Sequence, residues 1–308
     1  MYLDYIVFSG VKVLKKSLFT IVAIVLVSAC TKSAVTPTPA PYVSVPLADL
    51  ATNSQLIVYG NGMGWATRYN DDTWSKNQNG PRLQRFISTG TDDEYEAVFR
   101  NYDEDVEYGR ATFTMPDASA TVSGITDLGY EFTITRNDED TLIYTLTGLF
   151  TINLTPGIGE PLHAGGGFAT GSYTGDEALQ LLSGSASYSG SFIGESTYAG
   201  RVTGDVDLNV NFDISTDEVD GLIYNLVGTT GDYIFNNLII SATIEPTSSF
   251  EGILNVETTP DGVFAFGETG QIKGGFYGPG AEEFGATIRI TDGNNHILAG
   301  AISGSLDP

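Results

Sequence analysis

The strongest constraint in this sequence is a strict alternation of apolar and polar residues over positions 201–215, RVTGDVDLNVNFDIS. Successive side chains of an extended chain point to opposite faces, so a period of two places all the apolar residues on one face. A helix would mix the two sets. The segment is therefore predicted to be a strand that buries the face formed by Val202, Val206, Leu208, Val210, Phe212 and Ile214.

Similar alternation recurs toward the C-terminus, at 234–244, 250–256 and 284–290, with turn-forming segments such as STDEVDG and TDGNN in between. From Ser185 onward, eight or nine strands follow one another at intervals of roughly ten to fifteen residues, which is typical of a meander or barrel. Closing the sheet removes its exposed edges, and eight strands enclose a space that side chains can fill. We predict a packed, eight-stranded antiparallel β-barrel over residues 184–308.

The preceding region is also rich in strands, although the pattern is less regular. Residues 155–175 are dense in glycine and show no periodicity, which predicts a junction that leads into one helical turn at DEALQLL, 176–182. The predicted fold class is all-β, with an irregular β-rich domain, here called the handle, at 47–168, a junction at 169–183, and the barrel. Strands of the handle are predicted at 56–60, 64–69, 83–89, 95–101, 109–115, 128–135 and 142–150.

The N-terminus predicts export and lipidation. Three lysines precede an apolar run of thirteen residues, 17–29, which is the length of a signal-peptide core and short for a membrane span. It ends in Val27-Ser28-Ala29-Cys30, which resembles a bacterial lipobox. Cys30 is the only cysteine, so no disulfide competes for its thiol. We interpret 1–29 as a lipoprotein signal peptide, Cys30 as the site that carries lipid such as palmitate, and 30–46 as a flexible tether. A membrane anchor followed by a buried thiol is the alternative.

The net charge limits the partners. The chain carries -24, and the leader has three Lys and one Asp, so the chain from Cys30 onward carries -26. Such a surface excludes nucleic acid and anionic lipid as bound partners. The acidity also has a simpler explanation, which is that it keeps a tethered protein soluble.

No catalytic, cofactor or metal site is predicted. The two histidines, His163 and His296, lie far apart in turn-like contexts, and no G-x-S-x-G motif occurs. The acidic clusters at 101–107 and 136–140 lack the EF-hand pattern. A carboxylate-based hydrolase remains an alternative, because a chain with this many acidic residues offers many possible pairs.

One basic and aromatic stretch, 64–86, stands out on this acidic chain. Trp, Tyr and Arg are common anchors of protein interfaces. A half-buried strand and loop of the handle would have the same composition. The candidate ligand-binding residues are Trp65, Arg68, Trp74 and Arg82.

A glycine-rich motif near the C-terminus carries a family resemblance. The residues are Gly275, Phe276, Tyr277, Gly278 and Pro279, then Ala281, Glu282, Glu283 and Gly285. Followed by an alternating strand, the motif resembles the last barrel hairpin of the transferrin-binding protein B family, and GSASYSGSFIGE at 184–195 is similar to that family's first barrel strand. As a corner, the motif is expected to bend at its glycines and to leave Glu282 and Glu283 facing water.

The resemblance implies one lobe of a lipid-anchored outer-membrane protein, displayed on the cell surface or the periplasmic face. It implies a protein or small-solute ligand of the iron- or haem-carrier class, and a TonB-dependent receptor or a surface-lipoprotein translocator as further partners. Thr31, in place of the aspartate that retains lipoproteins in the inner membrane, favours the outer membrane. A structural envelope or matrix lipoprotein without a ligand is the alternative.

Overall fold

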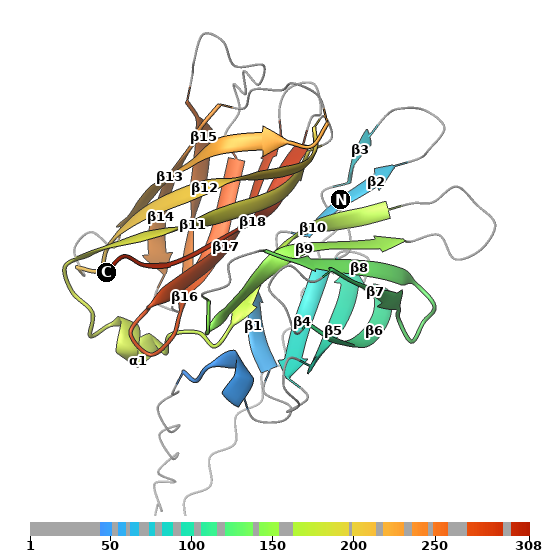
Figure 1. Ribbon diagram of the computed structural model, residues 1–308, viewed down its shortest axis with the longest axis horizontal. Coiled ribbons are helices and arrows are strands. Elements are labelled where there is room, and N and C mark those ends of the chain that lie inside the picture. The colour runs from blue at the N-terminus through green and yellow to red at the C-terminus, as the bar shows by residue number, and fades with distance from the viewer. Residues whose placement is uncertain are drawn as a thin grey trace, which may run out of the picture. The chain divides into compact units, whose positions relative to one another are not determined.

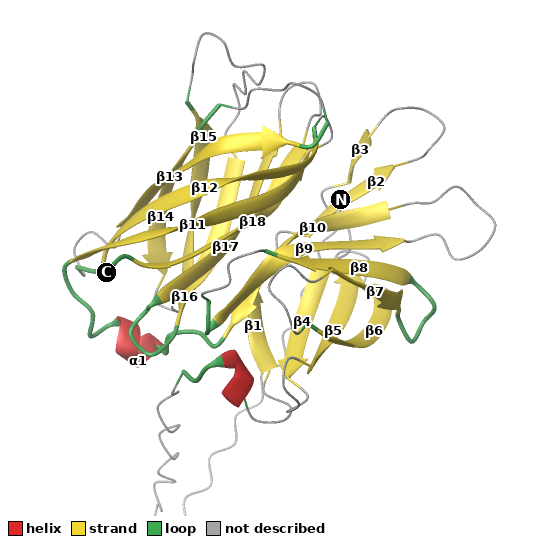
Figure 2. Cartoon of the chain, in the orientation of Figure 1, coloured by secondary structure: helices red, strands yellow, loops and turns green. Residues whose placement is uncertain are grey.

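The structure is a computed structural model, and it describes residues 44–50, 55–59, 62–67, 74–77, 82–88, 94–101, 106–115, 121–137, 142–153, 163–196, 199–213, 218–230, 236–245, 249–257, 270–291 and 297–308. Residues 40–308 form one unit that contains both a handle sheet and a barrel (Figure 1). Strands dominate both parts (Figure 2).

The C-terminal part is a closed antiparallel barrel of eight strands, in chain order around the ring, which confirms the predicted architecture. Its strands are β11 (Ser185–Ser196), β12 (Gly200–Asn211), β13 (Glu218–Gly228), β14 (Leu238–Glu245), β15 (Ser249–Val256), β16 (Gly270–Tyr277), β17 (Glu283–Thr291) and β18 (Ile297–Leu306). The predicted alternation holds in β12, where Val202, Val206, Leu208 and Val210 are buried. Asp205 and Asp207 on the same strand are exposed.

Aromatic side chains pack the barrel interior. Phe276 lies at the centre of this group, with its ring centroid 5.3 Å from those of Phe212 and Phe250 and 6.2 Å from that of Tyr188. Buried aliphatic residues from the seven strands β12 to β18 surround these rings. The interior is a packed core, as the strand number predicts.

The handle is a ten-stranded sheet in the order β6-β5-β4-β1-β10-β9-β8-β7, with β2 and β3 attached to β10 as a side ribbon. Its elements are η1 (Leu47–Asp49), β1 (Gln55–Tyr59), β2 (Gly62–Thr67), β3 (Trp74–Asn77), β4 (Arg82–Ser88), β5 (Glu94–Asn101), β6 (Val106–Thr114), β7 (Thr121–Ile125), β8 (Glu131–Arg136), β9 (Thr145–Asn153) and β10 (His163–Gly171).

The handle sheet curls over its own core. Phe99 on β5 contacts Phe132 on β8 and Phe150 on β9, with ring centroids 5.5 and 6.2 Å apart, although these strands lie in different halves of the sheet. The sheet therefore folds its two halves toward each other and buries apolar side chains of β1, β5, β6, β8, β9 and β10 between them.

The glycine-dense stretch that the sequence predicts to be a junction is, over His163–Gly171, a central strand of the handle. β10 pairs with β9 along its full length, and on its other side with β1 and β2. Only afterwards does the chain reach the predicted helical turn, α1 (Asp176–Leu179). The prediction was wrong because a strand buried on both faces does not alternate, and glycines carry no apolar signal.

Glycine is required in β10 because the strand crosses the barrel at backbone contact distance. A Cβ on Gly167 would collide with the carbonyl oxygen of Gly300 on β18 and lie 2.9 Å from the N atom of Ala301. Handle and barrel thus meet here without intervening side chains.

We expect Gly167→Ala to lower the free energy of unfolding by about 3 kcal/mol, because the added methyl group would have to push the backbones of β10 and β18 apart. Denaturant unfolding of the variant measures this. Gly280→Ala is the control, since the nearest atom to its Cβ is a carboxylate oxygen of Glu282 at 3.3 Å. We expect less than about 0.5 kcal/mol there. Equal stability of the two variants would contradict the close crossing.

Candidate binding surfaces and the seam between handle and barrel

The glycine-rich motif forms the hairpin between β16 and β17, as predicted. Among its glycines, Gly278 takes a positive φ of 86°, and the other residue with positive φ in the turn is Ala281 at 60°. Phe276 points into the barrel core, whereas Tyr277 packs outward against Ala169 of the handle. The hairpin is therefore a contact element between barrel and handle as well as a corner.

The prediction that Glu283 faces water was wrong. Glu283 is only 3% exposed. Its carboxylate accepts hydrogen bonds from the backbone N–H groups of Ile143, at 2.6 Å, and Tyr144, at 3.0 Å. Burial raises the pKa of Glu283. Hydrogen bonds from residues 143–145 stabilise the ionised carboxylate and so oppose that rise. The neighbouring Glu282 is partly exposed, and it accepts from the Gly280 N–H at 2.8 Å within the turn.

Main-chain hydrogen bonds extend this connection. The N–H of Ser172 donates to the carbonyl of Tyr144, and the N–H of Gly278 donates to the carbonyl of Ser172. Thr174 donates from its N–H to Phe276 and from its hydroxyl to Gly278. The segment leaving the handle sheet is thus tied both to the handle and to the barrel hairpin.

A second set of buried polar side chains joins strands of the handle to strands of the barrel. Thr147 on β9 donates its hydroxyl to that of Ser303 on β18 at 2.8 Å, and the Asn137 side-chain amide donates to Ser303 at 3.1 Å and to Ser191 on β11 at 2.9 Å. Leu149 packs beside them against Ile193 and Ala301. We call this contact surface of β9 and β10 with β11, β17 and β18 the seam. Hydrogen bonds of Asn137, Thr147 and Ser303 cross it, so handle and barrel are joined there.

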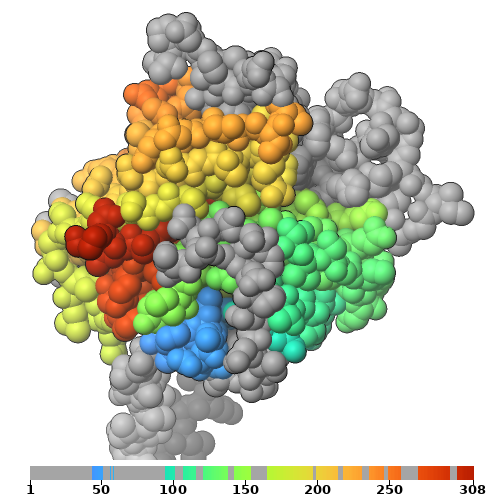
Figure 3. Space-filling view, in the orientation of Figure 1, coloured from blue at the N-terminus to red at the C-terminus, as the bar shows by residue number. Residues whose placement is uncertain are grey.

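The first described residues of the chain also bind at the seam. The Ser44 hydroxyl donates to the Ser172 carbonyl at 2.8 Å, and the Val45 N–H donates to the Ser172 hydroxyl at 2.9 Å. The Leu47 N–H donates to the carbonyl of Ile143. Figure 3 shows η1, in blue, at the surface beside green handle residues and the orange-red hairpin. Ser44 and Val45 belong to the predicted tether, 30–46, so the prediction that this segment is free up to Pro46 was wrong: its last residues are bound to Ser172.

The structure places part of the predicted basic and aromatic group on one ribbon. Trp65 on β2 is the register partner of Lys76 on β3, and Thr67 is the partner of Trp74, so these four positions fall on the same face of the ribbon. Arg82 lies apart from them at the start of β4, paired with β5. Arg68 lies outside the described residues. These positions remain candidates for ligand binding.

The other predicted sites fall mostly outside the described residues. Cys30 and His296 lie there, as do residues 102–105 and 138–140 of the two acidic clusters. His163 begins β10, opposite Asn153. Over the described ranges, His, Cys, Asp and Glu side chains form no group of three or more that could hold a metal ion. Within the same ranges, no helix has the length and apolar character needed to cross a membrane.

Sequence reasoning missed the seam itself. Its polar members, Asn137, Thr147, Ser191, Ser303 and Glu283, come from segments far apart in the chain, and each is an ordinary surface residue by type. The available signal was the Thr-x-Thr pattern of β9, which places Thr145 and Thr147 on the face opposite the handle core. Both are buried, and this indicates a second packed layer.

Comparison with known proteins supports the resemblance. Residues 169–305 match the family model described as the C-lobe and N-lobe β-barrels of Tf-binding protein B, which confirms the relationship that the hairpin motif indicates. The match begins upstream of β11 and includes α1. Comparison with curated proteins finds no match.

Solved structures of similar fold include transferrin binding protein B, isotype 1, from serogroup B Neisseria meningitidis. It is 15% identical, with a TM-score of 0.42, over 81% of this chain and 57% of that one. A double mutant of transferrin binding protein B from Haemophilus parasuis Hp5 is 16% identical, with a TM-score of 0.44, over 81% and 60% of the two chains. The chain thus spans about three fifths of the length of the solved structures it matches.

We expect Glu283→Ala to lower the free energy of unfolding by about 2–5 kcal/mol, because two backbone N–H groups lose their acceptor at a buried position. Urea unfolding of the variant measures this. The control is Glu251→Ala, which removes an exposed ion pair with Lys273 at 3.2 Å. We expect about 0–1 kcal/mol there. A loss for Glu283→Ala no larger than for the control would mean that the carboxylate does not hold the seam.

The raised pKa of Glu283 also predicts a pH dependence. Because the folded state binds this proton more tightly than the unfolded chain, stability from the group is fully present below the unfolded pKa and is lost as pH rises through the folded pKa. The stability of the wild-type chain minus that of Glu283→Gln should therefore fall as pH rises from about 4 toward 7. Unfolding measured at a series of pH values tests this. A difference that is flat or grows with pH would refute it.

Proposed function

We propose that this chain, whose residues 169–305 match the barrel model of Tf-binding protein B, is a non-catalytic binding lipoprotein of the bacterial outer membrane. The observation that carries the proposal is the combination of this barrel with the Val27-Ser28-Ala29-Cys30 lipobox in one chain. In this function Cys30 bears the lipid, the residues between it and Ser44 form the tether, and the joined handle and barrel form the binding body on the cell surface.

The proposed ligand is a protein or small solute of the iron- or haem-carrier class. The matched solved structures are named for transferrin binding, and this chain covers part of their length. A TonB-dependent receptor would take up the solute, and a surface-lipoprotein translocator would deliver the protein to the outer face. The candidates Trp65, Arg68, Trp74 and Arg82 lie in the handle, which leaves the barrel as the supporting body.

The seam supports a binding role rather than a catalytic one. Its buried polar groups are paired between handle and barrel, with Glu283 accepting two hydrogen bonds. An enzyme built on carboxylates would need an acid and a base that face a common substrate. The most strongly buried carboxylate of the described chain instead binds backbone N–H groups, which is a structural use.

Lipidation and display are tested together in cells that produce the full chain. We expect the wild-type protein to incorporate labelled palmitate and to be cleaved by protease added to intact cells. Cys30→Ser should lose the label, because no other thiol is available in the sequence. Gel autoradiography and immunoblotting report the two results.

Label retained by Cys30→Ser would contradict lipidation at this thiol. Protection of the wild-type chain in intact cells, with cleavage only after lysis, would place the protein on the periplasmic face. A pull-down that recovers nothing above background, together with expression that does not respond to iron, would favour the structural envelope lipoprotein.

A further inference from the structure

The outer face of the barrel opposite the seam carries a row of exposed aliphatic side chains. β14 lies opposite β18 in the ring of eight strands, so β13–β15 form the side of the barrel away from the seam (Figure 1). Leu222 on β13 is the register partner of Ile239 on β14. Ile253 on β15 is the partner of Ser241, two residues along β14 from Ile239. These three aliphatic residues, here called the barrel row, are therefore neighbours on one face of the sheet.

The barrel row breaks the alternation that the rest of this surface follows. Ile239 is 41% exposed and Ile253 is 46% exposed, whereas the outward positions 203, 205, 207 and 209 of β12 are all polar. A water-facing side of an antiparallel sheet normally carries polar residues. The barrel core does not account for the row, because the inward positions of the same strands fill that core with other residues, among them Ile223, Ile240 and Leu254.

Carboxylates lie beside the barrel row. Asp207 on β12 is the register partner of Leu222, and Asp220 precedes Leu222 by two positions on the same face of β13; both aspartates are exposed. Asp205 is the partner of Tyr224, the next outward residue of β13. The pKa of Tyr224 is raised by partial desolvation and then by the charges of Asp207 and Asp205. Negative potential therefore extends over this end of the row.

The basic residues of the barrel leave these carboxylates uncompensated. Residues 184–308 contain three basic residues, Arg201, Lys273 and Arg289, and the acidic residues far outnumber them. Two of the three form ion pairs elsewhere, Arg201 with Glu195 at 2.8 Å and Lys273 with Glu251 at 3.2 Å. Within the described part of the chain, Asp207 and Asp220 have no ion-pair partner. Like charges at neighbouring positions of a sheet face repel one another, at a cost to the folded chain.

We propose that the barrel row, with Asp207 and Asp220 beside it, is a docking surface for a partner protein that presents an apolar side chain flanked by lysine or arginine. Contact with the apolar side chain buries the row, and the partner's cations relieve the repulsion between the carboxylates. The row stands on paired strands, so its backbone loses little conformational entropy on binding. The surface is remote from the handle candidates, and the proposal does not depend on the ligand proposed for them.

The test places a photo-crosslinking amino acid at position 241 of the full-length chain in its native cells. Ser241 is exposed beside Ile253 and is not itself part of the surface. We expect an adduct whose partner peptide, identified by mass spectrometry, contains Lys or Arg next to apolar residues. The double substitution Asp207→Asn/Asp220→Asn, and separately Ile239→Ser, should each lower the adduct yield about fivefold or more.

Two matched controls remove the same chemistry from the handle. Glu131→Gln neutralises an exposed carboxylate of β8, and Ile125→Ser removes an aliphatic side chain that is 65% exposed at the end of β7. Both should leave the yield unchanged. Equal losses in the controls would show that the partner responds to the acidity of the whole chain, and they would overturn the proposal.

Thermal unfolding of the purified variants should match or exceed that of the wild type, because the substituted side chains face water and the aspartates repel each other. A large loss of stability in Ile239→Ser would show that the row serves packing, and it would overturn the proposal. So would the absence of an adduct, an acidic partner peptide, or an adduct with the mass of two copies of this chain. Each of these results leaves palmitate labelling at Cys30 and ligand binding by the handle as separate measurements of the proposed function.

Discussion

The structure depends on how the buried main chain between handle and barrel finds hydrogen-bond partners. Where the chain enters β9, the N–H groups of Ile143 and Tyr144 are turned toward the barrel and away from the handle sheet. An unpaired N–H group at such a position costs about 1–3 kcal/mol. Glu283 supplies both acceptors from a single carboxylate. Together with the hydrogen bonds of Asn137, Thr147 and Thr174, this pair joins the handle sheet to the barrel.

The barrel could be predicted from the sequence because its strands face a packed interior on one side and water on the other. That asymmetry produces the alternation of β12, and it is visible without knowing any partner strand. The seam lacks this asymmetry. β10 is buried on both faces, and its glycines are needed because Gly167 meets the backbone at Gly300. Glu283 resembles any acidic turn residue until its partners, some 140 positions earlier, are known.

Candidate sites are divided between the two parts in a way that follows from the packing. The barrel interior is filled by rings around Phe276, and its handle-facing side is covered by the seam. Side chains that can contact a ligand therefore lie on the handle and on the outer surface of the barrel away from the seam. The sequence indicated the handle through its basic and aromatic residues. It gave no sign that the β7–β8 turn is held against β6, because Thr126 reads as a solvent-facing turn residue and is in fact buried and bound to the Tyr108 carbonyl.

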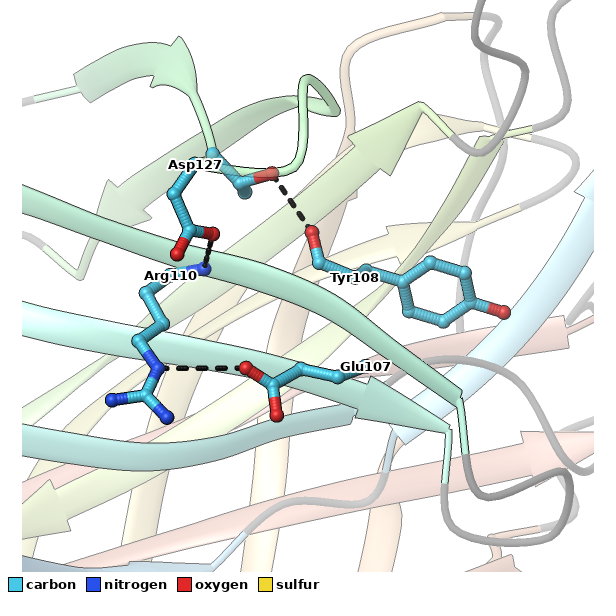
Figure 4. Close-up of polar contacts among 5 residues, drawn as sticks. Glu107, Tyr108, Arg110 and Asp127 are labelled. Atoms are coloured by element: carbon cyan, nitrogen blue, oxygen red, sulfur yellow. Dashed lines mark hydrogen bonds and ion pairs between the residues drawn. The ribbon is translucent and has the colours of Figure 1, made fainter.

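The turn and the seam illustrate the same physical rule. In both places a short polar side chain binds main chain of a neighbouring segment, Asp127 on β6 and Glu283 before β9. Glu283 is buried in making this contact, whereas Asp127 stays exposed while it fixes its turn (Figure 4). The consequence differs with position. At the seam, rigidity joins two folded parts, whereas at the edge of the handle it leaves Ile125 and Leu128 held outward with nothing from the described chain covering them.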